Sequence, residues 1–575
     1  MLRISSTYGI ASTAKTIVLI SLLLVLLCLS VGAWAADAGS LQREVSAAGK
    51  TIPKDTAVNE AKRTDNVDDS PKVFVNSYDI LGASLIPVSE IQIHIQPFTG
   101  RNLSLSELAA VKAEISGLYR SRGYLARAVL PQQTIKEGVV KVIIFEARLG
   151  KITLEEVDKN IRFPRERIRE LVERGQKKGN PIRILDLENN ISDLDGESGV
   201  AAQAELIAGE REGETDIVIK ASSEPIINGS VRFDNHGSRA SGSVRAITNL
   251  NLESPFKKGE RFSFLAIGAE GLRSLGGDIT IPSGRPGTTV GLSGSILNYE
   301  LGKPVSSLQA DGEAKTLAAN IKGPIYRGLK SGINLRVDIS KNLYINRTVF
   351  GESSNKYIDN VSTNLSFDYR DEVGGGGINV VNLTPAYGIL DLSGNSEDLA
   401  QDQAGPRRNG QFAKLGFELA RVQRITELNR IKIAIAGQKA FKNLDSAQKF
   451  SLGGPQGIRA YPNGEASGDT AVVVQTEAQH SFSDKVRGSA FYDWGWVNVD
   501  HNTFSEDGKS SANTPNSYSL HGLGVGLSYI PFEWAELKAD FSVGLGNNPG
   551  EDVNGDNSDG TSKTYRFWLQ LISRF

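Results

Sequence analysis

Alternation between apolar and polar residues is the strongest constraint on the fold of this chain of 575 residues. It begins near Ile226 and continues to the last residue, Phe575. In GINLRVDIS, residues 332–340, every second side chain from the isoleucine on is apolar and those between are polar. AELKADFSVGL, residues 535–545, and TYRFWLQLISRF, residues 564–575, repeat the pattern. This period is typical of β-strands with one apolar face, and runs of about 9–11 residues can cross a bilayer when tilted.

Sixteen such runs can be distinguished, starting near residues 226, 242, 260, 275, 288, 311, 330, 355, 376, 410, 429, 471, 486, 517, 535 and 564. Connections after even-numbered runs are short, whereas several after odd-numbered runs are long, namely 393–409, 442–470, 498–516 and 547–563. This asymmetry and the even number are typical of outer-membrane barrels. Closure is required in lipid because an open sheet edge leaves N–H and C=O groups unpaired. The alternative, which these features disfavour, is a soluble all-β protein with half-buried strands.

The N-terminal segment predicts export from the cytoplasm. Residues 1–35 begin with basic side chains, continue with an apolar stretch at 17–29 and end on the small-x-small sequence Ala33-Trp34-Ala35, which predicts a signal peptide cleaved after Ala35. An uncleaved anchor is the alternative, but the stretch is shorter than the roughly 20 residues that a spanning helix needs. Cleavage removes Cys28, the single cysteine, and with it any disulfide or thiolate chemistry. The formal charge of -2 gives no basic surface for nucleic acid.

The segments between the signal and the barrel predict two small α+β domains. Residues 36–71 are polar, with a short helical stretch and then a linker. In 72–150, strand-like segments, among them IQIHI at 91–95, surround a helix whose apolar residues recur at spacings of three and four over 105–118. Residues 151–223 contain two further helical stretches between strands.

A Gly- and Pro-rich loop carries a single arginine. FSLGGPQGIRAYPNGEASGD, residues 450–469, joins the eleventh and twelfth runs and has Arg459 in its middle. In the thirteenth run Asp493 alternates with Tyr492 and Trp494, and because Tyr and Trp suit the lipid interface, Asp493 is expected to face the lumen. If the loop folds into the barrel, Arg459 can pair with Asp493. The alternative is that Arg459 is solvated and Asp493 pairs with another lumen residue, and spacing alone does not decide between them.

The sequences GGPQGIRAYPNGEASGD and FYDWGWV closely resemble the outer-membrane transporters of two-partner secretion, the haemolysin secretion/activation protein (ShlB/FhaC/HecB) family. In that family the arginine of an Ile/Val-Arg-Gly/Ala-Tyr/Phe motif on the sixth outer loop contacts the aspartate of a Phe-x-Asp-x-Gly strand motif inside the barrel. The matching residues here are Ile458, Arg459, Tyr461, Phe491, Asp493 and Gly495. The resemblance implies that the Arg459–Asp493 pair acts either as a latch or as a stabiliser of the loop.

The resemblance also implies the fold: a 16-stranded antiparallel transmembrane β-barrel preceded by two small α+β periplasmic POTRA domains. It divides the chain into a signal peptide at 1–35, a plug helix and linker at 36–71, a first POTRA domain at 72–150, a second at 151–223 and the barrel at 224–575.

The function implied is an outer-membrane pore that binds a partner exoprotein in the periplasm and translocates it to the cell surface. The partner, of adhesin or haemolysin type, would bind in extended form by adding a strand to an exposed sheet edge. LARAVLP offers such an edge because Pro131 cannot serve an interior ladder position, and the helix at 106–121 would form the other wall of the groove. The candidate client-binding residues are Leu125, Ala126, Arg127, Ala128 and Val129.

Other partners implied are outer-membrane lipids and the barrel assembly machinery that would insert the protein. Two alternative functions remain open. One is an outer-membrane protein assembly and insertion factor, which would insert other barrels instead of exporting a partner. The other is a receptor or diffusion porin, for which two periplasmic domains would have no purpose.

No residue pattern indicates catalysis, a cofactor or a metal site. The five histidines are scattered, with no pair at ligand spacing. EDVNGDNSDG, residues 551–560, departs from a calcium-binding loop. Counted from Asp552 as the first position, Gly555 stands at the fourth and Lys563 at the twelfth, where Glu is needed. No nucleophile–base constellation stands out in the sequence, so we expect no enzymatic activity and no cofactor.

Overall fold

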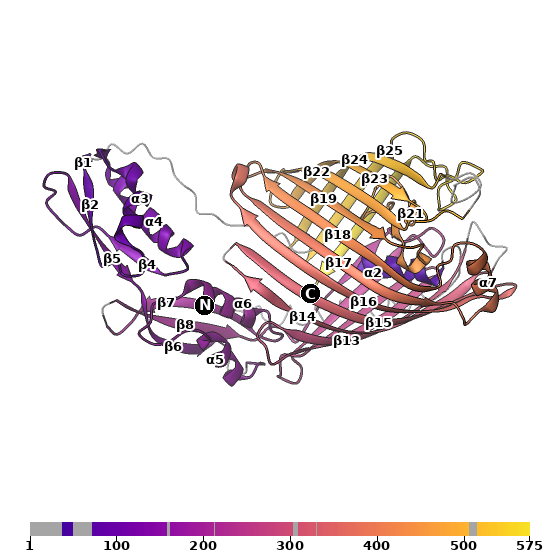
Figure 1. Cartoon of the computed structure of the whole chain (residues 1–575), viewed down its shortest axis with the longest axis horizontal. Helices are drawn as coiled ribbons and strands as arrows, with labels where there is room; N and C mark the ends of the chain where they lie inside the picture. Colours follow the sequence, from indigo (N-terminus) through magenta and orange to yellow (C-terminus); the bar gives the residue numbers. More distant parts are fainter. Residues whose placement is uncertain are drawn as a thin grey trace, which may run out of the picture.

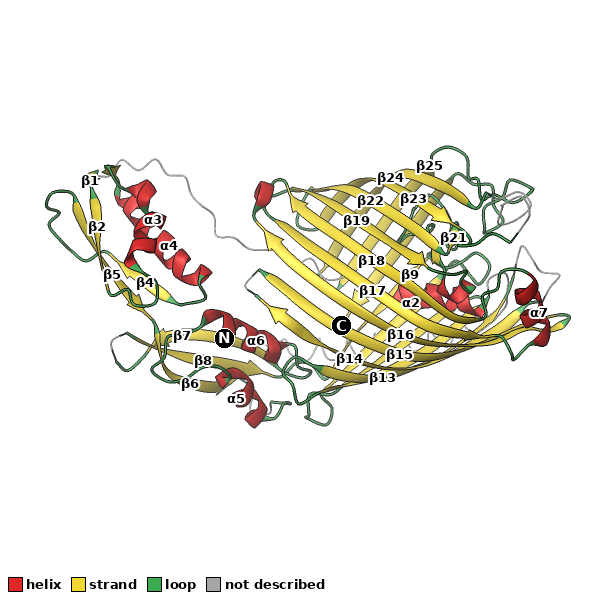
Figure 2. Cartoon of the chain, viewed as in Figure 1, coloured by secondary structure: helices red, strands yellow, loops and turns green. Residues whose placement is uncertain are grey.

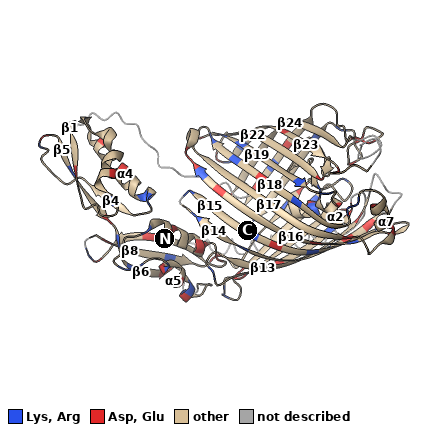
Figure 3. Ribbon diagram, viewed as in Figure 1, with Lys and Arg blue, Asp and Glu red and all other residues tan. Residues whose placement is uncertain are grey.

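The computed structural model describes residues 37–49, 72–157, 161–211, 213–302, 309–328, 330–504 and 515–575. The predicted signal peptide and linker lie outside the described residues. Figures 1 and 2 show two small α+β units next to one end of a large β-barrel, with the helix α2 inside the barrel. Acidic and basic residues are mixed over the small units and the barrel in the same view (Figure 3).

The first unit packs helices against a three-stranded sheet of order β2-β5-β4, with β1 and β3 paired beside it. Its elements are β1 (Val73–Val75), β2 (Ser77–Leu81), α3 (Val88–His94), η1 (Gln96–Phe98), β3 (Arg101–Leu103), α4 (Leu105–Ser121), β4 (Ala126–Val129) and β5 (Val139–Glu146). The Ser104 side chain and Glu107 cap α4 reciprocally. Val111 and Ile115 of the same helix are fully buried against the sheet.

The segment at 91–95, predicted as a strand, is mostly helical, and that prediction was wrong. Pro87 precedes the first turn of α3 and Glu90 lies in it, and a carboxylate is favourable at that end of a helix. Ile91 and Ile95 are buried four residues apart, while Ile93 is 72% exposed. In so short a run, apolar residues fit one helical face as well as they fit alternation.

The second unit has the sheet order β6-β8-β7 and two helices. Its elements are β6 (Arg148–Glu156), α5 (Arg165–Glu173), α6 (Ile184–Asp195), β7 (Ala201–Ala208) and β8 (Glu214–Ser222). The unit contacts one end of the barrel, where an Arg162 guanidinium N–H donates to the Ser254 carbonyl at 2.9 Å. Asp193 and Arg327 form an ion pair of 2.6 Å at the same end.

The barrel consists of 16 strands that pair in chain order, apart from the short β20 and β21, and it closes where β26 pairs with β9. The strands are β9 (Ile227–Asp234), β10 (Arg245–Glu253), β11 (Arg261–Ala269), β12 (Leu272–Pro282), β13 (Thr289–Glu300), β14 (Asp311–Arg327), β15 (Ser331–Thr348), β16 (Gly351–Asp371), β17 (Gly377–Asp391), β18 (Gly410–Arg424), β19 (Asn429–Ala440), β22 (Thr470–Ser481), β23 (Val486–Asn498), β24 (Ser517–Phe532), β25 (Ala535–Gly544) and β26 (Tyr565–Arg574). The predicted antiparallel barrel and its strand number are confirmed.

The connections between barrel strands contain small elements of their own. The short turn after β16 contains η3 (Val373–Gly375), and the long connections contain α7 (Ser396–Ala404), η4 (Ser446–Gln448), β20 (Phe450–Ser451) and β21 (Ser467–Gly468). Side chains of the barrel strands alternate between the two faces of the wall. In β23, Tyr492 is 44% exposed and the next residue, Asp493, is 0% exposed. Among the described residues, no helix is both long and apolar enough to cross a membrane.

The helix α2 (Ala38–Gly49) lies in the lumen. Ala38 and Leu41 are fully buried, and Val45 is nearly so. They form one apolar cluster with lumen-facing side chains of the wall, among them Tyr299 and Tyr344. The polar stretch that predicts a short plug helix therefore corresponds to a helix that fills part of the barrel.

Candidate functional site

The connection between β19 and β22, residues 441–469, folds into the barrel and buries its tip. β20 and β21 pair with each other in this connection, and Leu452 and Ile458 between them are fully buried. The Ile458 N–H donates to the Leu452 carbonyl at 2.7 Å, which closes a tight turn. A Cβ on Gly457 would lie 1.9 Å from that carbonyl oxygen. Glycine is therefore required here for close approach of the backbone.

Arg459 stands at the loop tip, 3% exposed, between two carboxylates. Its Nε and Nη2 donate to the two carboxylate oxygens of Asp493 at 2.9 and 2.8 Å, and its backbone N–H donates to Asp493 at 3.1 Å. Its Nη1 donates to Glu477 at 2.7 Å. Burial lowers the pKa of Arg459, but the hydrogen bonds with Asp493 and Glu477 outweigh it and raise the pKa above its ordinary value. The structure thus brings Arg459 and Asp493 together and adds Glu477, which the sequence analysis did not identify.

Phe491 and two side chains near the barrel closure complete the surroundings of Arg459. The guanidinium carbon lies 3.3 Å from the centre of the Phe491 ring, a cation–π contact. The Arg459 carbonyl accepts hydrogen bonds from Ser542 Oγ at 2.6 Å and from Trp568 Nε1 at 2.7 Å. One loop residue therefore contacts β22, β23, β25 and β26.

Small residues on the wall make room for the loop tip. A Cβ on Gly495 would lie 2.9 Å from Ile458 Cδ1, and one on Gly522 would lie 2.6 Å from the Ala460 Cβ. Tyr461 is 5% exposed and belongs to the same apolar cluster as Ile458. The residues of the two predicted motifs, in the loop and in β23, thus lie together in the lumen.

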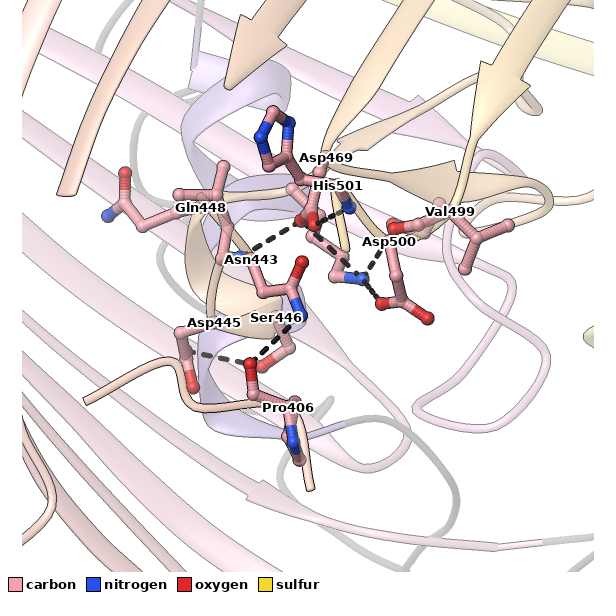
Figure 4. A network of polar contacts seen from close by, with 12 residues as sticks. Pro406, Asn443, Asp445, Ser446, Gln448, Asp469, Val499, Asp500 and His501 are labelled. Carbon is pink, nitrogen blue, oxygen red and sulfur yellow. Dashed lines mark hydrogen bonds and ion pairs between the residues drawn. The ribbon is translucent and has the colours of Figure 1, made fainter. Parts of the chain in front are cut away.

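Polar contacts tie the base of this loop to two neighbouring outer loops (Figure 4). The buried Asp469 accepts hydrogen bonds from the backbone N–H groups of Leu444 at 3.0 Å and His501 at 2.8 Å. Asn443 donates to the Pro406 carbonyl at 2.9 Å. The loops that follow β17 and β23 therefore hold the base of the inward loop.

The plug helix contacts the same loop. Gly39 packs so closely on Ala447 that a Cβ would lie 2.6 Å from the Ala447 Cβ. Arg43 donates to a backbone carbonyl in the loop. Asp37 forms an ion pair with Lys356 of β16 at 3.4 Å. Burial by itself raises the pKa of Asp37, but Lys356 and the neighbouring serine hydroxyls hold this pKa well below its usual range.

The candidate client-binding residues lie at one edge of the first unit. β4 stands at the end of its sheet, next to β5. Ala126 and Ala128 face the core, and Arg127 is exposed. Leu125 precedes β4 and packs against the core of the second unit instead. The structure therefore groups the other four residues on the edge strand and separates Leu125 from them.

Two stretches of the chain match known families. Residues 213–529, more than half of the chain, match the haemolysin secretion/activation protein ShlB/FhaC/HecB family. The chain belongs to this family. Residues 73–147 match the ShlB-type POTRA domain.

Relatives of this transporter cover most of its length. It is 26% identical over 502 residues to the heme/hemopexin transporter protein HuxB of Haemophilus influenzae, a match that covers 85% of each chain. It is 23% identical to the outer membrane transporter CdiB of Escherichia coli, over 88% of this chain and 84% of that one. The solved structure of CdiB from Escherichia coli has the same fold, with a TM-score of 0.62 at 20% identity over 93% of this chain and 96% of that one.

The family, the relatives and the fold together define the role of the protein. It is an outer-membrane transporter of two-partner secretion, with POTRA domains in the periplasm and a 16-stranded barrel in the membrane. Its partner is a secreted exoprotein, as the family implies. The predicted family, function and location are confirmed, and the family is one of transporters rather than of enzymes.

Proposed function

We propose that this transporter recognises its exoprotein in extended form at the edge strand β4 of the first POTRA domain. The observation that carries the proposal is the position of β4 at the end of the sheet β2-β5-β4. An edge strand presents a row of backbone N–H and C=O groups that an extended chain can pair with. Arg127 stands on this strand with its guanidinium 5.8 Å from the centre of the Phe145 ring.

The helix α4 supplies the second wall of the proposed groove, since it packs beside β4. Its capped N-terminus and buried apolar face hold it in place. Backbone pairing along β4 would give affinity, and side chains of α4 would select among client sequences. Of the candidate residues, Ala126, Arg127, Ala128 and Val129 form the proposed edge, and Leu125 supports it through the second POTRA domain.

Translocation then requires the lumen to clear. The plug helix and the inward loop both occupy it, and they touch each other at Gly39 and Ala447. We propose that the plug helix leaves the lumen, and that the contacts of Arg459 with Asp493 and Glu477 form the latch that keeps the loop in the inward position that export needs. The exoprotein would pass through unfolded and fold outside, so that folding at the surface drives export.

We propose four further properties of the protein. The domain division follows the predicted ranges 1–35, 36–71, 72–150, 151–223 and 224–575. The barrel faces outer-membrane lipids and is inserted by the barrel assembly machinery. The protein has no enzymatic activity. It serves a dedicated exoprotein instead of assembling other outer-membrane barrels.

The edge proposal is tested by site-specific cross-linking in cells that secrete the exoprotein, which is first identified as the large protein lost from the culture supernatant when the gene is deleted. Arg127→Cys, carrying a short thiol-reactive cross-linker, is expected to trap the exoprotein during export. Lys141→Cys on the central strand β5 is the matched control, because Arg127 and Lys141 are both exposed basic residues. The single native cysteine, Cys28, lies in the predicted signal peptide, so background labelling is low.

Adducts at Arg127→Cys and none at Lys141→Cys support pairing at the edge. Equal adducts at both positions, or none at either while secretion proceeds, contradict it. A broad loss of outer-membrane barrels on deletion, without loss of one exoprotein, would instead favour an assembly factor.

A further inference from the structure

An open groove of about 1120 Å³ lies on the wall of the barrel across β10 to β16. Leu297 of β13 and Tyr344 of β15 pack with the plug helix and therefore face the lumen. Because successive side chains of a strand point to opposite faces, the residues next to them in sequence, and every second residue from there, face lipid. Ile296 and Leu317 line the groove and are 49% and 61% exposed. The groove therefore opens toward the lipid and not toward the lumen.

Two glycines in register create the floor of this groove. Gly277 of β12 pairs with Gly294 of β13, and the same row continues to Phe264 on one side and Leu317 on the other. The wall between Phe264 and Leu317 is consequently bare backbone. A Cβ at Gly294 would meet nothing nearer than 3.7 Å. The fold therefore does not need glycine at this position, and a larger side chain there would fill the groove.

Three cationic side chains line the groove, namely Arg273, Lys315 and Lys341. No carboxylate is among the described residues that line it. Lys315 contacts Glu313 at 2.8 Å and Lys341 contacts Asp359 at 3.3 Å, both outside the lining. The two lysine side chains are still 47% and 61% exposed. They can therefore bind a further anion while keeping these partners, because an ammonium group has three donors.

Two of the three cations, Arg273 and Lys315, lie near the surface ends of their strands, whereas Lys341 pairs in register with Leu317. The second POTRA domain contacts the turn after β10 at Ser254, which marks the periplasmic end, so β12 and β14 start at the surface end. Arg273 is the second residue of β12 and Lys315 the fifth of β14. Phe264 lies nearer the periplasmic end of its strand, as the fourth residue of β11. The groove is thus cationic near the outer surface, at Arg273 and Lys315, and apolar toward Phe264.

We propose that this groove binds the phosphorylated, multiply acylated glycolipid of the outer leaflet, the lipid A part of lipopolysaccharide. Its phosphates bind the three cations in charge-assisted hydrogen bonds. One acyl chain lies on the glycine floor between Phe264 and Leu317. There it packs against the wall more closely than the mobile chains of bulk lipid do. A phospholipid of the inner leaflet would present its phosphate at the opposite end of the groove.

The test is native mass spectrometry of the full-length transporter in detergent, titrated with bis-phosphorylated lipid A. Lys315→Gln with Lys341→Gln is expected to weaken lipid A binding about tenfold or more, since each cation near a membrane surface contributes on the order of 1 kcal/mol toward anionic lipid. Gly294→Leu is expected to weaken binding without removing charge, because it fills the floor.

Two variants are matched controls. Lys439→Gln removes an exposed cation near the surface end of β19, and Ala319→Leu enlarges an exposed residue of β14; neither position lines the groove. Both are expected to bind lipid A like the wild type. Heat-modifiable migration in gels verifies that every variant contains a folded barrel.

Selective loss in the double lysine variant and in Gly294→Leu supports the site. Equal lipid A binding in all variants overturns it. Phosphatidylglycerol bound as tightly as lipid A, with the same sensitivity to the variants, also overturns it and indicates a general anionic-lipid surface. Displacement of lipid A by millimolar inorganic phosphate would overturn the role of the acyl chains.

Discussion

Arg459 is held by a geometry that lysine cannot reproduce. Its guanidinium donates to both oxygens of Asp493 and to Glu477 while it lies over Phe491. A lysine keeps the charge but offers a point donor instead of a planar fork. Arg459→Lys is therefore expected to weaken docking of the loop tip by about 2–3 kcal/mol, the scale of charged hydrogen bonds lost in a buried site. The measurement is the amount of exoprotein secreted, together with proteolysis of residues 441–469 in intact cells.

The expected result is reduced secretion and faster cleavage of the loop. Arg407→Lys, at an exposed position in another outer loop, is the matched control and should behave like the wild type. Secretion and protease resistance unchanged in Arg459→Lys would show that the bidentate contact is dispensable.

Part of the Arg459 site could be predicted from the sequence. Alternation in β23 placed Asp493 on the lumen face, and the lone arginine between glycines pointed to a loop partner. Glu477, Ser542 and Trp568 were out of reach, because their contacts with Arg459 depend on where the loop tip stops against the register of four strands. Strand register across a barrel follows from closure of the whole sheet, which local spacing does not encode.

At the scale of elements, the plug helix and the inward loop fit each other through one glycine. A Cβ on Gly39 would lie 2.6 Å from the Ala447 Cβ, and backbone atoms of Ala447 lie nearly as close. Gly39→Val is therefore expected to displace the helix and raise the conductance of the purified transporter in planar bilayers. Ala47→Val, on the exposed side of the same helix, is the matched control. Wild-type conductance in Gly39→Val would mean that the helix does not close the pore through this contact.

Helices and strands could be predicted more reliably where their apolar–polar pattern extends over more residues. Barrel strands repeat a period of two over many residues, so their positions followed from the sequence closely. The five residues 91–95 were too few to separate a strand from the helix α3. The lipid-facing groove was not predictable either, because Gly277 and Gly294 belong to different strands and meet only through strand pairing.

At the scale of the whole molecule, the second POTRA domain meets the barrel through residues next to Glu197. Ser198 donates to Glu253 and to the Glu260 carbonyl at the periplasmic end. Glu197 is 5% exposed, and burial raises its pKa to about 7, with Asp193 adding to the rise and Arg167 opposing it. The charge state of Glu197 therefore changes within the pH range in which the domain must stay docked.

The sign of the effect follows from linkage. The folded-state pKa of Glu197 lies above its ordinary value of 4.5, so protonation favours the folded domain. This stabilisation is complete below about pH 4.5 and is lost as the pH rises through about 7. Glu197→Gln removes the titration while keeping the shape. We expect the variant to protect residues 161–200 from hydrogen exchange more than the wild type at pH 8, with a smaller difference at pH 6.

Comparison of the two proteins at each pH cancels the intrinsic pH dependence of exchange, so the difference reports on Glu197 alone. Glu173→Gln, at an exposed position of α5 in the same domain, is the matched control. It should have the same small effect on protection from hydrogen exchange at pH 6 and at pH 8. A difference for Glu197→Gln that is the same at pH 6 and pH 8 would show that the carboxyl does not titrate between them. A larger difference at pH 8 would mean that the junction between the periplasmic domains and the barrel loosens as Glu197 ionises. Docking of the second POTRA domain on the barrel would then depend on the pH of the periplasm.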